Sequence, residues 1–177
     1  LILPSATERA AAIDDNQPSA VSGGTSSNGA IVGMDIVSTD IKTGKKTVMV
    51  HAAQLIPAGA KEPLRVESYT WSADRTKLLI FTNSRRVWRQ NTRDDYWVLN
   101  LATNELKQLG KGLDESRLMF AKISPDGQKA AYVYYNNVYV EDLASGTRKA
   151  LTSDGDDVIV NGTFDWVYEE ELSCRDG

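Results

Sequence analysis

The sequence contains one cysteine and one histidine, and these counts exclude several kinds of site. Cys174 cannot form an internal disulfide bond, so cysteine usage does not identify the redox compartment. A metal centre built from several His and Cys ligands is excluded by the same counts. A Ser-His-Asp hydrolase would have to use His51, and no G-x-S-x-G motif occurs in the 177 residues. We therefore expect no metal, no cofactor and no catalytic nucleophile in this chain, with His51 as a surface group.

Long apolar runs and a strong charge of either sign are also missing. No run approaches the roughly 18 residues that cross a bilayer, and residues 1–4 are too short for the apolar part of a signal peptide. A net charge of −4 argues against a nucleic-acid binder. With 41% hydrophobic and 25% charged residues, the composition is that of a globular domain or part of one. Because the chain opens without Met and ends without closing its last element, we expect a fragment that lacks both ends.

Aromatic residues are missing from the first 68 positions. The four Trp, seven Tyr and three Phe residues all lie from Tyr69 onward, which places the core in the second part of the chain. Residues 1–30 are rich in Ala, Ser and Gly, and S-G-G-T-S-S-N-G at 22–29 has the composition of an unstructured segment. We predict a flexible or weakly ordered lead-in over 1–30 and a folded domain over 31–177.

Short β-favouring runs separated by turn residues follow from residue 33, and they repeat. W-S-A-D at 71–74 precedes an apolar run, as does I-S-P-D-G at 123–127, with an offset of 52 residues between Asp74 and Asp126. A hairpin turn recurs three times, at 40–44, 100–104 and 142–146. Its last residue is Gly or Asn, which fits a position that must adopt positive φ.

Each full repeat predicts four antiparallel strands. In the second repeat we expect strands over 119–124, 129–135, 138–142 and 148–152, with one buried face where residues alternate. Four-stranded units at a period of about 40–50 residues indicate a β-propeller, whose blades bury their faces against neighbours. The predicted fold is thus all-β, with about two and a half blades of a larger propeller.

The first full repeat is ten residues longer than the second between its two turns. It runs from Asp74 to Leu101, whereas the second runs from Asp126 to Leu143. The extra residues fall at about 85–95 and include R-R-V-W-R-Q. We expect them to project from the blade rather than join its ladder, because insertions in repeat proteins form loops that carry binding groups.

An acidic block, D-W-V-Y-E-E-E-L, occupies residues 165–172 after a predicted short strand at 158–160. We expect one or two helical turns over 166–172. Neighbouring carboxylates on so short an element repel one another, and a cation between them would relieve that cost. The ordinary alternative is a solvated face, to which three consecutive glutamates most often belong. The D-G-D-D run at 154–157 lacks calcium-loop spacing, and we interpret it as a turn.

Three segments together resemble a known family. Residues 161–172 read N-G-T-F-D-W-V-Y-E-E-E-L, residues 138–143 read V-Y-V-E-D-L, and residues 87–90 read V-W-R-Q. This combination is similar to the N-terminal propeller of dipeptidyl peptidase IV and its bacterial relatives, over roughly residues 33–177. The D-W-V-Y-E-E-E block is specific, whereas the S-P-D-G turn occurs in many propellers.

The resemblance implies a function and its residues. It assigns Glu170 and Glu171, but not Glu169, to binding the free amino terminus of a peptide substrate, and Arg89 to the substrate carbonyl near that end. It also implies a parent serine exopeptidase that removes dipeptides with proline or alanine second. The Ser, Asp and His would lie in a hydrolase domain beyond residue 177, so this chain alone should be inactive. The implied partners are peptides with a free N-terminus, the hydrolase domain and a second copy in a homodimer, and the implied location is periplasmic, secreted or cell-surface.

Elementary electrostatics agrees with this role. An α-amino group has a pKa of about 8 and is mostly an ammonium at neutral pH. Two carboxylates can each accept a charge-assisted hydrogen bond from it, and a blocked amine would leave them unpaired.

Two other functions remain open from the sequence. The first is a non-catalytic propeller that binds peptides or proteins. The second is a periplasmic propeller of the TolB-like kind, which the S-P-D-G turns would satisfy but which gives no reason for the block at 165–171.

Overall fold

The computed structural model describes residues 21–25, 31–87, 90–165 and 167–172, which form two compact units divided after Ala53. The first unit contains a three-stranded antiparallel sheet, β1 (Val21–Thr25), β2 (Ile31–Thr39) and β3 (Lys46–Val50). Within it, the side chains of Ile36 and Val50 are fully buried. β1 lies inside the segment that the sequence suggested is weakly ordered, and it pairs with β2. The predicted division at residue 30 stays a prediction.

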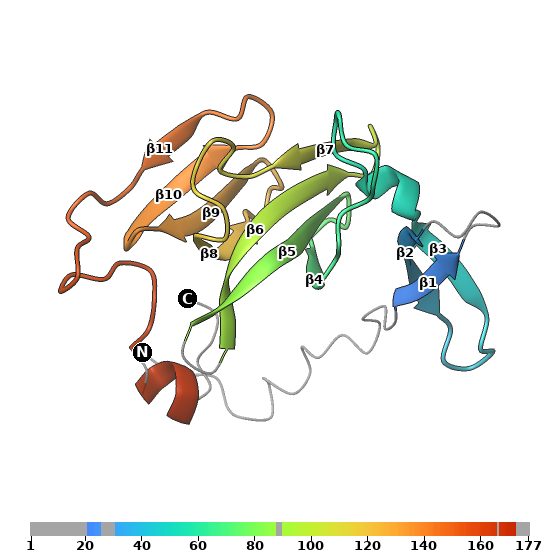
Figure 1. The fold of residues 1–177 in the computed structure, drawn as a ribbon, viewed down its shortest axis with the longest axis horizontal. Helices are drawn as coiled ribbons and strands as arrows, with labels where there is room; N and C mark the ends of the chain where they lie inside the picture. The colour runs from blue at the N-terminus through green and yellow to red at the C-terminus, as the bar shows by residue number, and fades with distance from the viewer. Residues whose placement is uncertain (1–20, 26–30, 88–89, 166, 173–177) are drawn as a thin grey trace. The chain divides into compact units, whose positions relative to one another are not determined.

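The second unit contains two four-stranded antiparallel blades (Figure 1). Blade A consists of β4 (Ser68–Trp71), β5 (Lys77–Val87), β6 (Gln90–Asn100) and β7 (Glu105–Gln108), paired in chain order. A 3₁₀ turn over Ala52–Leu55 precedes it in the chain.

Blade B repeats this order and matches the strands predicted from the sequence. It consists of β8 (Leu118–Ile123), β9 (Lys129–Tyr134), β10 (Asn137–Asp142) and β11 (Arg148–Ala150). The two blades meet where Asp94 of β6 pairs with Leu118 of β8. The all-β prediction is confirmed.

The turn between the first two strands of each blade has the same hydrogen bonds in both copies. Ser72 Oγ donates to Asp74 Oδ1 at 2.6 Å, and Ser124 Oγ donates to Asp126 Oδ1 at 2.5 Å. These contacts lower the pKa of both carboxyls; the Ser72 hydroxyl and the Thr76 amide and hydroxyl hold that of Asp74 at about 2. The repeated sequence therefore encodes a repeated turn.

The three predicted hairpin turns also share one geometry. The side-chain oxygen of Asp40, Asn100 or Asp142 accepts hydrogen bonds from the amides two and three residues ahead. The fifth residue has positive φ in each case, 68° at Gly44, 55° at Asn104 and 70° at Gly146. This confirms the conformation expected for that position.

The core of the second unit lies between the two blades. Leu79, Tyr96 and Val98 of blade A pack with Leu118, Ala130 and Tyr132 of blade B. In β6 the buried residues alternate from Thr92 through Asp94 and Tyr96 to Val98, with less buried residues between them, and the alternation ends at Leu99, which is also buried. A pleated strand with period two produces this pattern.

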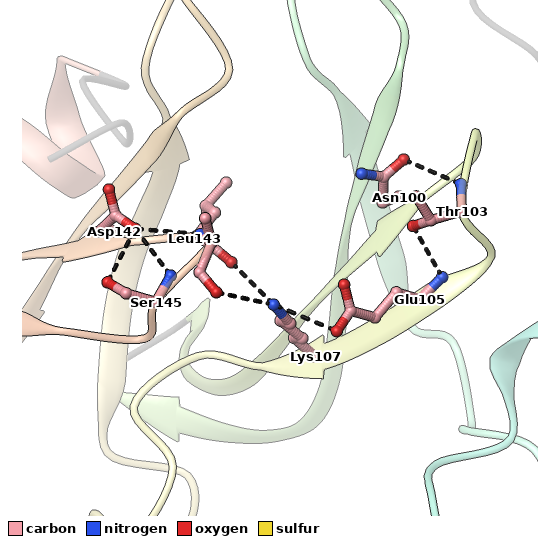
Figure 2. A network of polar contacts seen from close by, with 8 residues as sticks. Asn100, Thr103, Glu105, Lys107, Asp142, Leu143 and Ser145 are labelled. Carbon is pink, nitrogen blue, oxygen red and sulfur yellow. Dashed lines mark hydrogen bonds and ion pairs between the residues drawn. The ribbon is translucent and has the colours of Figure 1, made fainter.

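A lysine joins the outer strand of blade A to the hairpin turn of blade B. Lys107 Nζ donates to the carbonyl oxygens of Leu143 at 3.3 Å and Ala144 at 3.0 Å, and lies 3.2 Å from Glu105 Oε1 (Figure 2). An ammonium satisfies several acceptors at once, so this side chain binds the turn of one blade to the edge of the next.

Two sequence expectations are wrong. The insertion at 85–95 does join the ladder, because β5 and β6 continue to pair through Arg85↔Arg93 and Val87↔Gln90 across two register shifts. Residues 158–160 form no strand. The Asp156 carboxylate accepts hydrogen bonds from the amides of Val158 and Ile159 at 2.7 and 2.6 Å, which closes a turn and leaves Val158 88% exposed.

The helical segment with a glutamate pair is not supported as predicted. The described residues contain no α-helix, and the block carries only one π-helical turn, Val167–Glu171. Val167 is 38% exposed and Tyr168 50% exposed, so neither side chain is buried against the rest of the unit. One helical turn is too short to stabilise itself without such packing. Among the described residues, no helix has the length and apolarity to cross a membrane.

Candidate functional site

The π-helical turn at the acidic block begins at an aspartate cap. Asp165 Oδ1 accepts hydrogen bonds from the amides of Val167 at 2.9 Å and Tyr168 at 3.1 Å, and the Leu172 amide donates to the Val167 carbonyl at 3.2 Å. An aspartate at this position satisfies amides that the turn leaves without partners. The first residue of the D-W-V-Y-E-E-E block therefore shapes the backbone that carries its glutamates.

The predicted site residues are described to different extents. Glu171 belongs to the turn and is exposed. Glu170 belongs to the same turn, but its side chain lies outside the described part of the structure, as does the whole of Arg89. The assignment of these three residues to one site stays a prediction.

The β5–β6 hairpin carries the segment in which Arg89 lies, and its root is fixed on one side by three side chains. Asp95 Oδ2 accepts from Asn83 Nδ2 at 2.7 Å, and Asp95 Oδ1 accepts from the Ser116 amide at 2.7 Å. Ser116 is almost fully buried, and its Oγ donates to the Asn83 carbonyl at 2.6 Å. These bonds connect the hairpin to the segment between β7 and β8.

The other side of the hairpin root has its own polar contacts. Ser84 Oγ donates to the Glu67 carboxylate, and Asn91 Nδ2 donates to Ser84 Oγ at 2.7 Å. Asn83 has a φ of 53°, which marks the bulge at which the hairpin leaves the regular ladder. Sequence reasoning missed this root, although the Asn83-Ser84 pair between two strand-like runs is a signal for a bulge.

The remaining candidates are ordinary structural groups where they are described. His51 has a side chain that is 65% exposed, and its Nδ1 lies 3.7 Å from Asp35 Oδ2, which confirms the expected surface position. The D-G-D-D run contributes turn contacts, as expected. The described residues contain no group of three or more His, Cys, Asp or Glu side chains that could hold a metal ion. Cys174 lies outside the described residues.

Comparison with known proteins identifies the family. A family model for the dipeptidyl peptidase IV N-terminal region matches residues 72–177. The chain belongs to this family. The match covers β5 to β7 of blade A, all of blade B and the acidic block. Together with the structural likeness described next, it confirms the propeller prediction.

Members of the family and a related structure show how much of a complete protein this chain represents. The dipeptidyl aminopeptidase B of Saccharomyces cerevisiae is 38% identical over 110 residues, and a probable dipeptidyl-aminopeptidase B of Aspergillus oryzae is 31% identical over 140 residues, 78% of this chain. The crystal structure of Porphyromonas gingivalis dipeptidyl peptidase 4 matches 98% of the chain with a TM-score of 0.69 and 22% identity. The chain spans 13% and 14% of the two curated relatives and 25% of the crystallised one.

Proposed function

We propose that this chain is part of the propeller of a serine exopeptidase that releases dipeptides from peptide N-termini, and that it binds the free amino terminus of the substrate. The observation that carries the proposal is the family match over residues 72–177, a range that contains both the acidic block and the segment with Arg89. Glu170 and Glu171 would accept charge-assisted hydrogen bonds from the substrate ammonium. Arg89 would donate to the first peptide carbonyl with a guanidinium that stays charged.

The proposed role explains how a part without the nucleophile contributes to rate. If the carboxylates stand at a fixed distance from a serine on a separate hydrolase domain, only the bond two residues from the amino terminus reaches that serine. Positioning of this kind lowers the activation barrier by removing rotational and translational freedom before the chemical step. The preference for proline or alanine in the second position, the homodimer and a periplasmic or secreted location belong to the same proposal and derive from the family resemblance.

Substitution in the parent enzyme tests the assignment. With a Gly-Pro chromogenic substrate, Glu170→Gln and Glu171→Gln should each lower kcat/KM by about 10²-fold or more, because the variant loses a charged acceptor facing an ammonium. Glu169→Gln is the matched control and should change kcat/KM less than about threefold. If Glu170→Gln and Glu171→Gln both keep an activity near that of the unaltered enzyme, the assignment of these glutamates to the amino terminus is wrong.

A further inference from the structure

A cavity of about 680 Å³ lies between blade A and the first strand of blade B, beside the root of the β5–β6 hairpin. Strands β4, β5, β6 and β8 all contribute side chains to its wall. The groups that matter for its chemistry are Trp71, Phe81, Thr92, Asp94, Tyr96 and Phe120. Among the candidate amino-terminus residues, only Glu171 has a side chain that the structure describes, and it does not line the cavity.

The cavity contains a carboxylate at a position where the strand pattern calls for an apolar residue. Asp94 lies on the inward face of β6, between Thr92 and Tyr96, and is only 6% exposed. Its side chain accepts a hydrogen bond from Tyr96 Oη at 3.0 Å. Burial raises the pKa of Asp94 to about 6, and the nearby carboxylates of Glu67 and Asp95 act in the same direction. An ionised Asp94 is therefore a buried charge that needs compensation.

The groups that shift the pKa of Asp94 include two other carboxylates and no cation. Lys122 of β8 also lines the cavity, but no ion pair between it and Asp94 is found among the described residues. A hydrogen bond from one tyrosine hydroxyl is a partial substitute for a counter-ion, since a carboxylate offers about four acceptor positions. A charge supplied by a bound molecule would complete the arrangement.

Two further polar atoms of the cavity wall are buried without a partner in the structure. These are Thr92 Oγ1, on a residue that is 9% exposed, and Trp71 Nε1. Buried donors and acceptors are nearly always satisfied, so two orphans in one wall are unusual. Thr92 can accept a hydrogen bond from a ligand N–H, whereas Trp71 can only donate one, for example to a carbonyl oxygen.

Aromatic side chains form part of the cavity wall. Phe81 and Tyr96 meet edge to face with ring centroids 5.0 Å apart. Phe120 lines the same space with a φ of 53°, within an irregularity of β8 between Met119 and Lys122. A bulky residue in the left-handed region is strained, and such strain is concentrated at binding sites. Aromatic faces attract ammonium and guanidinium groups.

We propose that this cavity binds the ammonium or guanidinium group of an organic cation, with Asp94 as its counter-ion and Thr92 Oγ1 as a second acceptor. Trp71 Nε1 donates to a carbonyl oxygen of the same ligand, which makes a lysine or arginine residue of a peptide a better fit than a simple amine. A divalent metal ion fits less well, because the described residues offer no cluster of three ligating side chains here.

Titration calorimetry with acetylated probes tests the proposal. The probes are Nα-acetyl-lysine methylamide, its uncharged isostere Nα-acetyl-norleucine methylamide, and butylammonium. The two amides have no free amino terminus, but the lysine side chain still carries an ammonium that carboxylates such as Glu170 and Glu171 can bind, so the substitutions below are needed to assign binding to the cavity. We expect the lysine probe to bind at least about tenfold more tightly than the norleucine probe, and more tightly than butylammonium. Equal affinity for lysine and butylammonium would still support the cation site and would assign it to small amines.

Two substitutions identify the residues. Asp94→Asn keeps the size of the side chain and should weaken binding of the lysine probe at least about tenfold. Thr92→Val should weaken it by about three- to tenfold, which keeps the test valid if Asp94→Asn fails to fold. The exposed Asp157→Asn is the matched control and should leave the affinity within about twofold. Equal binding of the norleucine and lysine probes, no measurable binding of either, or full affinity in both variants would overturn the proposal.

Discussion

At the scale of single residues, Asp94 makes the stability of this unit depend on pH. Its folded-state pKa of about 6 lies above the ordinary value of 3.8, because burial disfavours the charged form. The protonated side chain therefore contributes stability that is complete below about pH 4 and is lost as the pH rises through about 6. At neutral pH Asp94 is ionised in the folded state, and its burial makes that charge unfavourable.

The substitution Asp94→Asn should relieve this cost. With no ligand present, we expect the free energy of unfolding at pH 8 to be about 1–2 kcal/mol higher for the variant than for the unaltered chain, after allowance for solvent screening. The difference should disappear at pH 4, where the aspartate is protonated. Urea denaturation at both pH values measures it. A variant that is less stable at pH 8 would mean that the charged form is satisfied within the fold.

The repeated turn offers a comparison of two equivalent positions. Gly127 has a φ of 68°, and Arg75 occupies the matching place in the first repeat with a φ of 56°. A Cβ on Gly127 would have room, since its nearest neighbour is the flexible Lys77 Nζ at 3.4 Å, so only the backbone conformation opposes a side chain.

We expect Gly127→Ala to lower the free energy of unfolding by about 1 kcal/mol and Arg75→Gly to raise it by about 0.5 kcal/mol. The second effect is smaller because glycine also increases the entropy of the unfolded chain. Chemical denaturation of the two variants side by side provides the measurement. Changes of the same sign would show that φ does not determine the choice of residue at this turn.

At the scale of elements, the β5–β6 hairpin depends on the contacts at its root. Asp95 accepts hydrogen bonds from both the Asn83 side chain and the Ser116 amide. Asp95→Asn replaces one acceptor oxygen with an NH₂ donor that would face a donor, so one of these bonds is lost. The hairpin should then open more often without unfolding of the blades.

Hydrogen exchange detects this opening. In Asp95→Asn, the paired amides over 85–87 and 91–93 should exchange about five- to tenfold faster, which corresponds to the loss of about one hydrogen bond. The amides of β9 and β10 should not change. Glu115→Gln, at an exposed carboxylate beside Ser116, is the control. Unchanged hairpin exchange in Asp95→Asn would show that this network does not position the hairpin.

Regular elements could be predicted from the sequence where local signals agree with one another. The strands of blade B and the three Asx-type turns follow from alternation and from the placement of Asp, Asn and Gly. The run at 158–160 has strand composition, but the Asp156 side chain competes for its amides and no neighbouring strand pairs with it. The pairing of the insertion depends on two register shifts, which alternation alone does not indicate.

Some features of the candidate site could also be predicted from local sequence, whereas others depend on the fold. Asp165 is the first residue of the acidic block, a position at which an aspartate is typical of a helix cap, and its contacts agree. The buried position of Asp94 follows from the two-residue period of β6, in which Thr92, Tyr96 and Val98 share its face. The cavity beside it requires β8 of the next blade, a relation that local sequence does not contain.

At the scale of the whole molecule, two blades and an acidic turn of the dipeptidyl peptidase IV N-terminal family act together in the proposed function. The blades pack through a shared core and through Lys107, so the hairpin of one blade and the turn that follows the other are parts of one unit. If residues of both segments bind the substrate amino terminus, the rigid blades hold that terminus at a fixed distance from the bond that is cleaved.

The central claim is that Glu170 and Glu171 recognise the charge of a free amino terminus. The most direct measurement is the ratio of kcat/KM for a Gly-Pro substrate to that for its N-acetylated form, in the parent enzyme and in Glu171→Gln. The account predicts a ratio of about 10² or more in the unaltered enzyme and a ratio at least tenfold smaller in the variant, because the lost carboxylate contributes only to binding the ammonium. If Glu171→Gln lowers kcat/KM for both substrates by the same factor and leaves the ratio unchanged, the glutamate does not recognise the amino terminus and the account is contradicted.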